Sequence, residues 1–349
     1  MQENIFEIES LDTATSVARS AATAGLTFTN AGNNLVYCDN PEFYTLYSNG
    51  MHCNWGASIG TTYKDVERYL NVGNGNKGTG QFRFGIAVQN TTGSAVTITY
   101  KYAGKHCSSA NGSISISDEA QLAYLTAATK TKRIAANSVA LLEGTDAAFA
   151  GANLSHWVIF HACLKASASS GVYFRVFIAG ASKMSNYTEL LNIPLASWMP
   201  LNYSMPDKLF CGELGYSQKN CTMNANSSGT YVLCEWPKNK NANEYSTAIT
   251  HKSGGNTILP GNYGVIYKMT IQNASGKRIR IVPYWDNPSE SMTNREVSLV
   301  ARFNGGTWQK LTHITMNQCW YRSLGSNSTA TVEIMLPGGN CGDLFVSFD

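Results

Sequence analysis

The sequence predicts an all-β protein made of two tandem β-sandwich or jelly-roll domains, the first with a short inserted helix. Two observations carry this prediction. A segment at 84–102, FGIAVQNTTGSAVTITYKY, recurs at 267–285 as YKMTIQNASGKRIRIVPYW. The rest of the chain consists of short apolar runs separated by turns rich in Gly, Asn and Ser, which is typical of β-sandwiches and β-barrels.

The recurring segment has the pattern of two half-buried strands joined by a turn. Apolar residues alternate on both sides of QNTTG and QNASG, with Phe84 falling on Tyr267 and Tyr102 on Trp285. Asn and Gly tolerate the left-handed backbone of a tight turn. We therefore expect a β-hairpin in each copy, with one face on a core.

A second recurrence places SSGVYFRVFIAG at 169–180 against NSTATVEIMLPG at 327–338, with Phe174 on Val332. The spacing between the two landmarks is about 25 residues longer in the first copy. The segment SDEAQLAYLTAATKTKR at 117–133 accounts for the difference, because Ser117 or Asp118 can cap a helix and Ala and Leu follow. It predicts the short inserted helix.

Further strands are expected at 34–38, 155–164, 295–303 and 343–348. The repeat is far longer than a solenoid unit, so it indicates two domains. We expect a polar lead-in or arm at 1–30, a first domain at 31–190, a connection at 191–206 that holds Pro194, Pro200 and Pro206, and a second domain at 207–349.

The segments FGIAVQNTTGSAVTI and YCDNPEFY at 37–44 resemble uncharacterised secreted tandem β-sandwich proteins of Gram-positive bacteria. The resemblance implies a fold and a compartment, and no activity.

The composition of the 349 residues limits the partners. Charged residues make up 14%, well below the average of soluble domains, so Ser, Thr, Asn and Gly must supply the polar surface, as in secreted β proteins. A net charge of +3 without a clustered basic face argues against nucleic-acid binding. No apolar run is long enough for a membrane span, and no signal peptide is evident, so a mature secreted form competes with a cytosolic one. Composition favours secretion or the cell surface.

Dispersed cysteines without a CxxC pair predict disulfides in an oxidising compartment. His161 and Cys163 share a strand face and could hold a metal or form a nucleophilic pair, but disulfides with incidental histidines are the preferred interpretation. Because the number of cysteines is odd, at least one thiol must remain outside an intramolecular disulfide. The nine candidates are Cys38, Cys53, Cys107, Cys163, Cys211, Cys221, Cys234, Cys319 and Cys341.

Two Asn-Pro segments carry oxygen-bearing side chains of the kind that calcium takes. Asn-Pro also simply begins turns, and this interpretation is preferred, so no cofactor is expected. The candidate metal residues are Asp39, Glu42, Asp286 and Glu290.

Aromatic residues beside polar or Gly-rich sequence are the strongest indication of a function. Sugar faces stack on flat rings, and Asn, Asp and Gln side chains bind hydroxyl groups. Core packing is the alternative, since large aromatics are mostly buried. The candidate platform is Trp55, Trp236, Trp285, Trp308 and Trp320.

The sequence contains no phosphate loop, nucleophile elbow or HExxH motif. We therefore expect a non-catalytic extracellular or cell-surface protein that binds a glycan or a surface partner. A structural subunit of a surface appendage or shell, assembled from tandem sandwiches, is the alternative. A secreted hydrolase is the third class.

Overall fold

The computed structural model describes residues 5–11, 25–39, 43–76, 80–107, 113–149, 155–192, 210–234, 244–245, 249–250, 258–284, 296–315, 317–338, 340 and 343–349. The chain divides into two compact units. One, here called the first sandwich, comprises Asn33–Gly215 with Thr247–Thr257. The other, the second sandwich, comprises Met1–Gly32, Tyr216–Ser246 and Ile258–Asp349.

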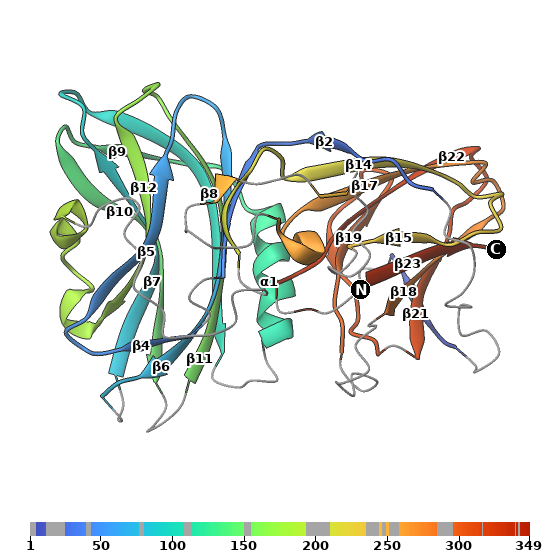
Figure 1. Cartoon of the computed structure of the whole chain (residues 1–349), viewed down its shortest axis with the longest axis horizontal. Helices are drawn as coiled ribbons and strands as arrows, with labels where there is room; N and C mark the ends of the chain where they lie inside the picture. Colours follow the sequence, from blue (N-terminus) through green and yellow to red (C-terminus); the bar gives the residue numbers. More distant parts are fainter. Residues whose placement is uncertain are drawn as a thin grey trace. The chain divides into compact units, whose positions relative to one another are not determined.

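The first sandwich has two sheets that face each other (Figure 1). Its smaller sheet has four strands in the order β10-β7-β12-β5: β5 Met51–Ser58, β7 Gly80–Asn90, β10 Ser138–Phe149 and β12 Val172–Gly180. The larger sheet has the order β16-β13-β3-β6-β11-β8-β9, with β4 also paired to β6. Its strands are β3 Asn34–Cys38, β4 Phe43–Leu46, β6 Lys64–Asn74, β8 Val96–Cys107, β9 Lys130–Ile134, β11 Ser155–Ala166, β13 Cys211–Leu214 and β16 Ile249–Thr250.

The second sandwich also has two sheets. The five-stranded sheet has the order β1-β21-β18-β23-β15: β1 Glu7–Ser10, β15 Tyr231–Leu233, β18 Arg278–Tyr284, β21 Gln318–Ser323 and β23 Asp343–Phe348. The six-stranded sheet has the order β2-β14-β17-β22-β19-β20: β2 Thr29–Ala31, β14 Gln218–Asn224, β17 Ile266–Gln272, β19 Val300–Phe303, β20 Gln309–Lys310 and β22 Thr329–Met335.

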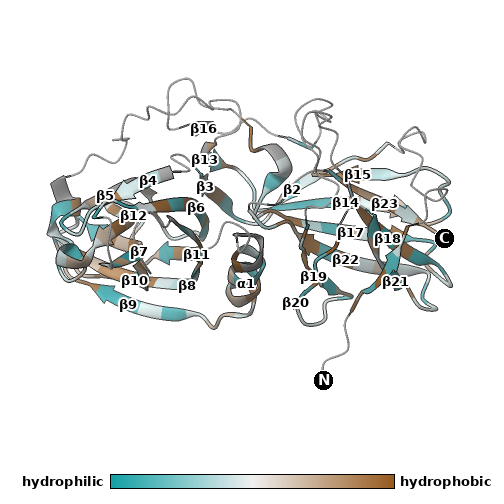
Figure 2. Ribbon diagram, turned by 90° about the horizontal axis from the view of Figure 1, so that it is seen from below, coloured by the Kyte–Doolittle hydropathy of each residue, from teal (hydrophilic) through white to brown (hydrophobic). Residues whose placement is uncertain are grey.

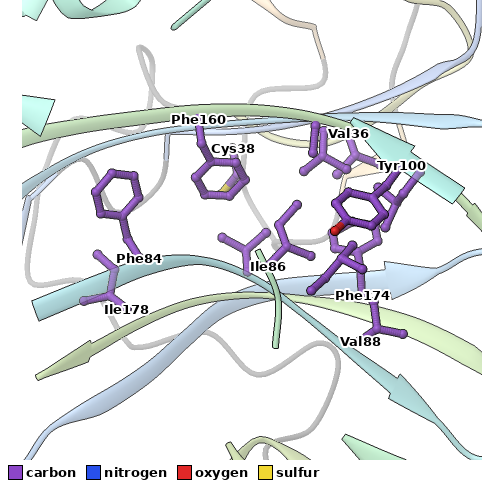
Figure 3. Packing of buried hydrophobic residues seen from close by; sticks show 14 of the residues in the cluster. Val36, Cys38, Phe84, Ile86, Val88, Tyr100, Phe160, Phe174 and Ile178 are labelled. Carbon is purple, nitrogen blue, oxygen red and sulfur yellow. The ribbon is translucent and has the colours of Figure 1, made fainter. Parts of the chain in front are cut away.

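Strand alternation places the core between the sheets. Along β7 from Phe82 to Val88 and along β11 from Val158 to Ala166 every second side chain is apolar and buried, and the hydropathy of the strands alternates accordingly (Figure 2). Figure 3 shows Phe84, Ile86 and Phe174 from the smaller sheet pointing toward Phe160 and Val36 from the larger one. The apolar pattern of the sequence thus builds one continuous core in the first sandwich.

The expected hairpins are wrong in both copies. β7 and β8 lie in different sheets, as do β17 and β18, so each NxxG turn carries the chain across the sandwich instead of joining neighbouring strands. Alternation could not reveal this, because each strand has one buried face in either arrangement. The turn side chain stabilises the crossing: buried Asn90 donates to the carbonyl oxygens of Ser94 and Ala135, both at 2.8 Å.

The second recurrence also has a matching place in both units, with a small shift. β12 pairs with β7 and β22 pairs with β17, both antiparallel. Phe174 lies opposite Val88, whereas its sequence counterpart Val332 lies opposite Met269, two residues before the counterpart of Val88. A shift of two keeps every side chain on its face, so the sequence pattern is preserved.

The inserted helix is present, with different bounds. α1 spans Ser113–Thr126, and the last part of the expected range forms β9, which pairs with β8. The alternating KTKRI segment buries Ile134 and exposes its charged neighbours, as an edge strand does. α1 packs on the outer face of the larger sheet, where Ile116 and Ala120 contact a cluster with Tyr69 and Ile159.

Strands at 34–38 and 343–348 are as expected, and β11 runs two residues beyond 164. Within the described residues 296–303, the strand is β19. Several strands fall near the expected domain limits. β13, beyond position 206, pairs with β3, while β1 and β2 from the lead-in region pair with β21 and β14. Among the described residues, no helix is long and apolar enough to cross a membrane.

Candidate functional site

The outer face of the smaller sheet in the first sandwich carries an unusual arginine. Phe174 and Val176 of β12 point into the core, so Arg175 between them points outward. It is nevertheless only 3% exposed. Its Nε and Nη2 both donate to Oε1 of Gln89, at 3.1 and 2.6 Å. Its Nη1 has no hydrogen-bond partner, and no acidic side chain in the described part of the chain pairs with it.

The cross-strand neighbours of Arg175 have small side chains or none. They are Ala87 on β7 and Gly56 on β5. Tyr173 lies opposite Gln89, and both are half-buried. We call Arg175, Gln89 and Tyr173 the Arg175 face. It combines a cation, an amide and an aromatic ring, the groups that recognise carboxylates and hydroxyls.

The opposite end of the same sheet face is closed. Arg83 forms a two-pronged ion pair with Asp146, with a second nitrogen distance of 2.9 Å, and its Nη1 donates to Tyr187 at 3.0 Å. The Asp146 hydrogen bonds raise the pKa of Arg83 and lower that of Asp146. Tyr187 and Leu190, from the 3₁₀ segment Thr188–Asn192 and the residue before it, pack on Phe177. Arg83 therefore has its counter-ion, whereas no acidic side chain among the described residues pairs with Arg175.

A buried polar cluster lies on the outer face of the larger sheet near α1. His161 Nδ1 lies 3.4 Å from Oε2 of Glu67, and the ring of Tyr124 stacks on that of His161 with centroids 5.6 Å apart. Tyr124 donates to Asp65 at 2.6 Å. Burial lowers the pKa of His161 to about 3 and raises that of Glu67, with a further contribution from the charge of Asp39. Burial thus favours the neutral form of each group.

The charge states of His161 and Glu67 indicate that this cluster has a structural role. A neutral imidazole beside a neutral carboxylic acid carries no net charge to offer a ligand, and both side chains are nearly inaccessible. His161 and Cys163 do share a face, as expected. Burial and the charge of Asp65 raise the pKa of the Cys163 thiol, so it is a poor nucleophile. The Cys-His pair therefore lacks the activated thiolate that nucleophilic catalysis needs.

The five expected platform tryptophans occupy different environments. Trp320 is fully buried and donates from Nε1 to the carbonyl oxygen of Thr312 at 2.7 Å. Trp308 is 8% exposed, with the guanidinium of Arg302 4.8 Å from its ring centroid. Neither ring presents an open face. Trp55 lies on β5, but its side chain is outside the described residues, as are Trp236 and Trp285 altogether.

Of the four expected metal residues, Asp39 alone lies in the described part of the chain. Asp39 accepts a hydrogen bond from the backbone nitrogen of Phe210 at 2.6 Å, which ties the end of β3 to the start of β13. Glu42, Asp286 and Glu290 lie outside the described residues. Within the described ranges, no group of three or more acidic, His or Cys side chains is placed to hold a metal ion.

The disulfide expectation is wrong for five of the nine cysteines, which form no disulfide: Cys107, Cys163, Cys221, Cys234 and Cys319. A disulfide needs a second cysteine within about 7 Å between Cα atoms. The cross-strand neighbours are instead Asp65 and Lys101 for Cys163, and Met269 for Cys221. Cys38 is disulfide-bonded, and Cys211 lies directly opposite it in the β3–β13 register. The side chains of Cys53, Cys211 and Cys341 lie outside the described residues.

No protein-family model matches the chain, and no curated protein matches it. Among solved structures it is similar to the CUB1-EGF-CUB2 domains of rat MASP-1, with 9% identity, a TM-score of 0.19, and coverage of 87% of this chain and 99% of that one. It is also similar to the tandem CBM22 domains of Paenibacillus barcinonensis Xyn10C, with 10% identity, a TM-score of 0.16, and coverage of 99% and 97%. At these TM-scores neither structure is evidence for the function of this chain.

Sequence reasoning missed the Arg175 face because it looked for tryptophans. The available signal was a charged residue at an interior position of an otherwise apolar strand, VYFRVFIAG. An arginine within such a strand must either find a counter-ion in the fold or receive one from a ligand.

Proposed function

We propose that the protein is a non-catalytic, secreted or cell-surface binding protein whose ligand is a glycan bearing carboxylate groups, bound on the Arg175 face. One observation carries the proposal: the guanidinium of Arg175 is buried, and among the described residues it bonds only to the neutral amide of Gln89, with Nη1 unbonded. A buried cation without a counter-ion is costly, and a carboxylate that completes its fork offsets that cost.

The neighbours of Arg175 fit a sugar. Gln89 keeps its amide nitrogen available for a hydroxyl, and the half-buried Tyr173 opposite it offers a ring edge and a phenol. A carboxylate that approaches Nη1 must displace the groups covering it, so binding requires a side-chain rearrangement at Tyr173 or Gln89. The low fraction of charged residues and the high content of Ser, Thr and Asn support an extracellular location. The disulfide at Cys38 fits an oxidising compartment.

A glycan array of neutral, sulfated and uronate-containing sugars tests the proposal. The expected result is binding confined to uronate-containing members, lost in Arg175→Met and retained in Arg133→Met, since Arg133 is an exposed arginine on β9 of the same sandwich. Circular dichroism of both variants checks that they fold. Silence of the wild-type protein across the array, or equal binding by Arg175→Met, would overturn the proposal.

The N-terminal strand favours a structural subunit as the second candidate. β1 is an edge strand of four residues, and Glu9 contacts Arg280 at 3.3 Å across the sheet. A short terminal strand at a sheet edge can be exchanged between copies. Size-exclusion chromatography with light scattering tests this: a concentration-dependent dimer or polymer that disappears on deletion of residues 1–11 supports it, and a monomer at all concentrations contradicts it.

A further inference from the structure

The six-stranded sheet of the second sandwich buries a lysine against an asparagine. Lys219 on β14 and Asn30 on β2 are direct cross-strand partners. Nζ of Lys219 donates to Oδ1 of Asn30 at 2.6 Å. Lys219 is 1% exposed, whereas Asn30, on the edge strand, is open to solvent. The amine is therefore held within bonding reach of the Asn30 carboxamide carbon by the register of two strands.

The surroundings of Lys219 are aromatic and include a buried carboxyl group. Its Nζ lies 3.8 Å from the ring centroid of Tyr216. The side chain of Tyr216 donates to Asn262 at 3.1 Å, and Asn262 donates to Tyr267 at 2.7 Å. Tyr267 in turn donates to Oε1 of Glu244, which is fully buried. A hydrogen-bonded chain thus joins the ring beneath the amine to a carboxyl group that water does not reach.

Burial prepares the amine for nucleophilic chemistry. It lowers the pKa of Lys219 to about 8, with the charge of Glu244 acting in the opposite direction, so a fraction of the amine is neutral near neutral pH. A neutral lysine amine held beside a carbonyl group is the arrangement used by nucleophilic lysines. Because the two strands hold the amine beside the carbonyl group, the reaction avoids most of the entropy cost of bringing the two groups together.

We propose that Lys219 and Asn30 join through an intramolecular isopeptide bond. The neutral amine of Lys219 attacks the side-chain carbonyl carbon of Asn30, and the Nζ–Cγ bond forms. Nδ2 of Asn30 takes up the proton lost from Nζ, and the Cγ–Nδ2 bond breaks. One ammonia molecule leaves through the exposed side of β2. The reaction consumes no oxidant and no other reactant.

The bond would have a clear mechanical consequence. β2 has only three residues and lies at the edge of its sheet. Short edge strands separate easily, and a covalent link to β14 fixes this one in place. The link would also hold the N-terminal part of the chain to the second sandwich independently of hydrogen bonds.

Intact-mass spectrometry of the full-length wild-type protein, followed by peptide mapping, tests the proposal. The expected result is a mass lower than that of the unmodified sequence by one ammonia, with a branched peptide that joins the segments around Asn30 and Lys219. Mapping is needed to place the loss of ammonia at Asn30 and Lys219. Lys219→Arg and Asn30→Ala should each abolish the branched peptide.

A matched control is available on the next strand pair. Lys268 on β17 lies opposite Asn220 on β14, but both are only half-buried. Lys268→Arg should retain the branched peptide and the loss of ammonia. Recovery of Lys219 and Asn30 in separate, unmodified peptides from folded wild-type protein would overturn the proposal, whatever the variants show.

Discussion

The rings of Phe84 and Phe160 stack at 26° with their centroids 6.4 Å apart, although the two residues belong to opposite sheets of the first sandwich. Both are essentially inaccessible to solvent. This contact joins the smaller sheet to the larger one and follows directly from the crossing of the chain between β7 and β8. A hairpin would have placed β7 and β8 in one sheet. Phe84 would then not face Phe160 of β11 across the core.

Removal of one of these rings should destabilise the first sandwich strongly. Phe84→Ala leaves a cavity between the sheets, and we expect the free energy of unfolding to fall by about 3–5 kcal/mol. Urea denaturation followed by circular dichroism measures it. Thr97→Ala, an exposed residue on β8, is the control and should change the free energy by less than about 0.5 kcal/mol. A loss below about 1 kcal/mol in Phe84→Ala would contradict the packing described.

The two recurring asparagines should respond differently to mutation. Asn90 is buried, and its side chain satisfies backbone carbonyl groups of Ser94 and Ala135. Asn90→Ala leaves these groups without a partner and should cost at least about 2 kcal/mol. Asn273 is exposed with φ of 56°. Asn273→Gly keeps that backbone accessible and should change stability by less than about 0.5 kcal/mol. Equal losses on thermal denaturation would contradict this difference.

Acid should weaken the first sandwich through His161. The unfolded imidazole takes up a proton near pH 6.5, whereas burial holds the folded pKa at about 3. The unfolded state binds more protons between these values, so stability falls as pH drops from about 6.5 to 3, by up to about 1.4 kcal/mol per unit. The raised pKa of Glu67 acts oppositely, since it makes stability fall as pH rises above the ordinary value of 4.5. The His161 contribution is isolated by comparison with His161→Gln, which should show a flatter loss from pH 6.5 to 4. Parallel curves for the two proteins would be inconsistent with a neutral buried His161.

Thiol labelling should distinguish the buried free cysteines from the disulfide-bonded Cys38. Burial raises the pKa of the Cys221 thiol to about 12, and Cys163 and Cys319 are shifted in the same direction. These thiols should react with Ellman's reagent slowly in the native protein and rapidly in guanidinium. Peptide mapping without reductant should find Cys38 linked, with Cys211 as the expected partner from the strand register. Rapid native labelling of Cys221, or an unlinked Cys38, would contradict the structure.

Much of the fold follows from local patterns, whereas the site does not. Period-two alternation is a property of each strand alone, so it correctly predicts β3, β11 and β23 and the all-β class. Which strands share a sheet depends on long-range pairing, and the turn between β7 and β8 was therefore misjudged. Burial depends on the whole fold, so Trp320 could not be told from a surface tryptophan. The significance of Arg175 depends on which side chains the assembled sheets bring beside it, and none of those described there is acidic.

The most direct test of the proposed function is the affinity of the protein for a polyuronate, measured by isothermal titration calorimetry. We expect polygalacturonate to bind the wild-type protein and dextran, a neutral glucan, not to bind. Loss of a charge-assisted fork is worth about 1.5–3 kcal/mol, so Arg175→Met should weaken binding about tenfold to a hundredfold. Arg133→Met should bind like the wild type. Equal affinity of Arg175→Met and wild type for polygalacturonate, or absence of heat with either polymer, would contradict the account.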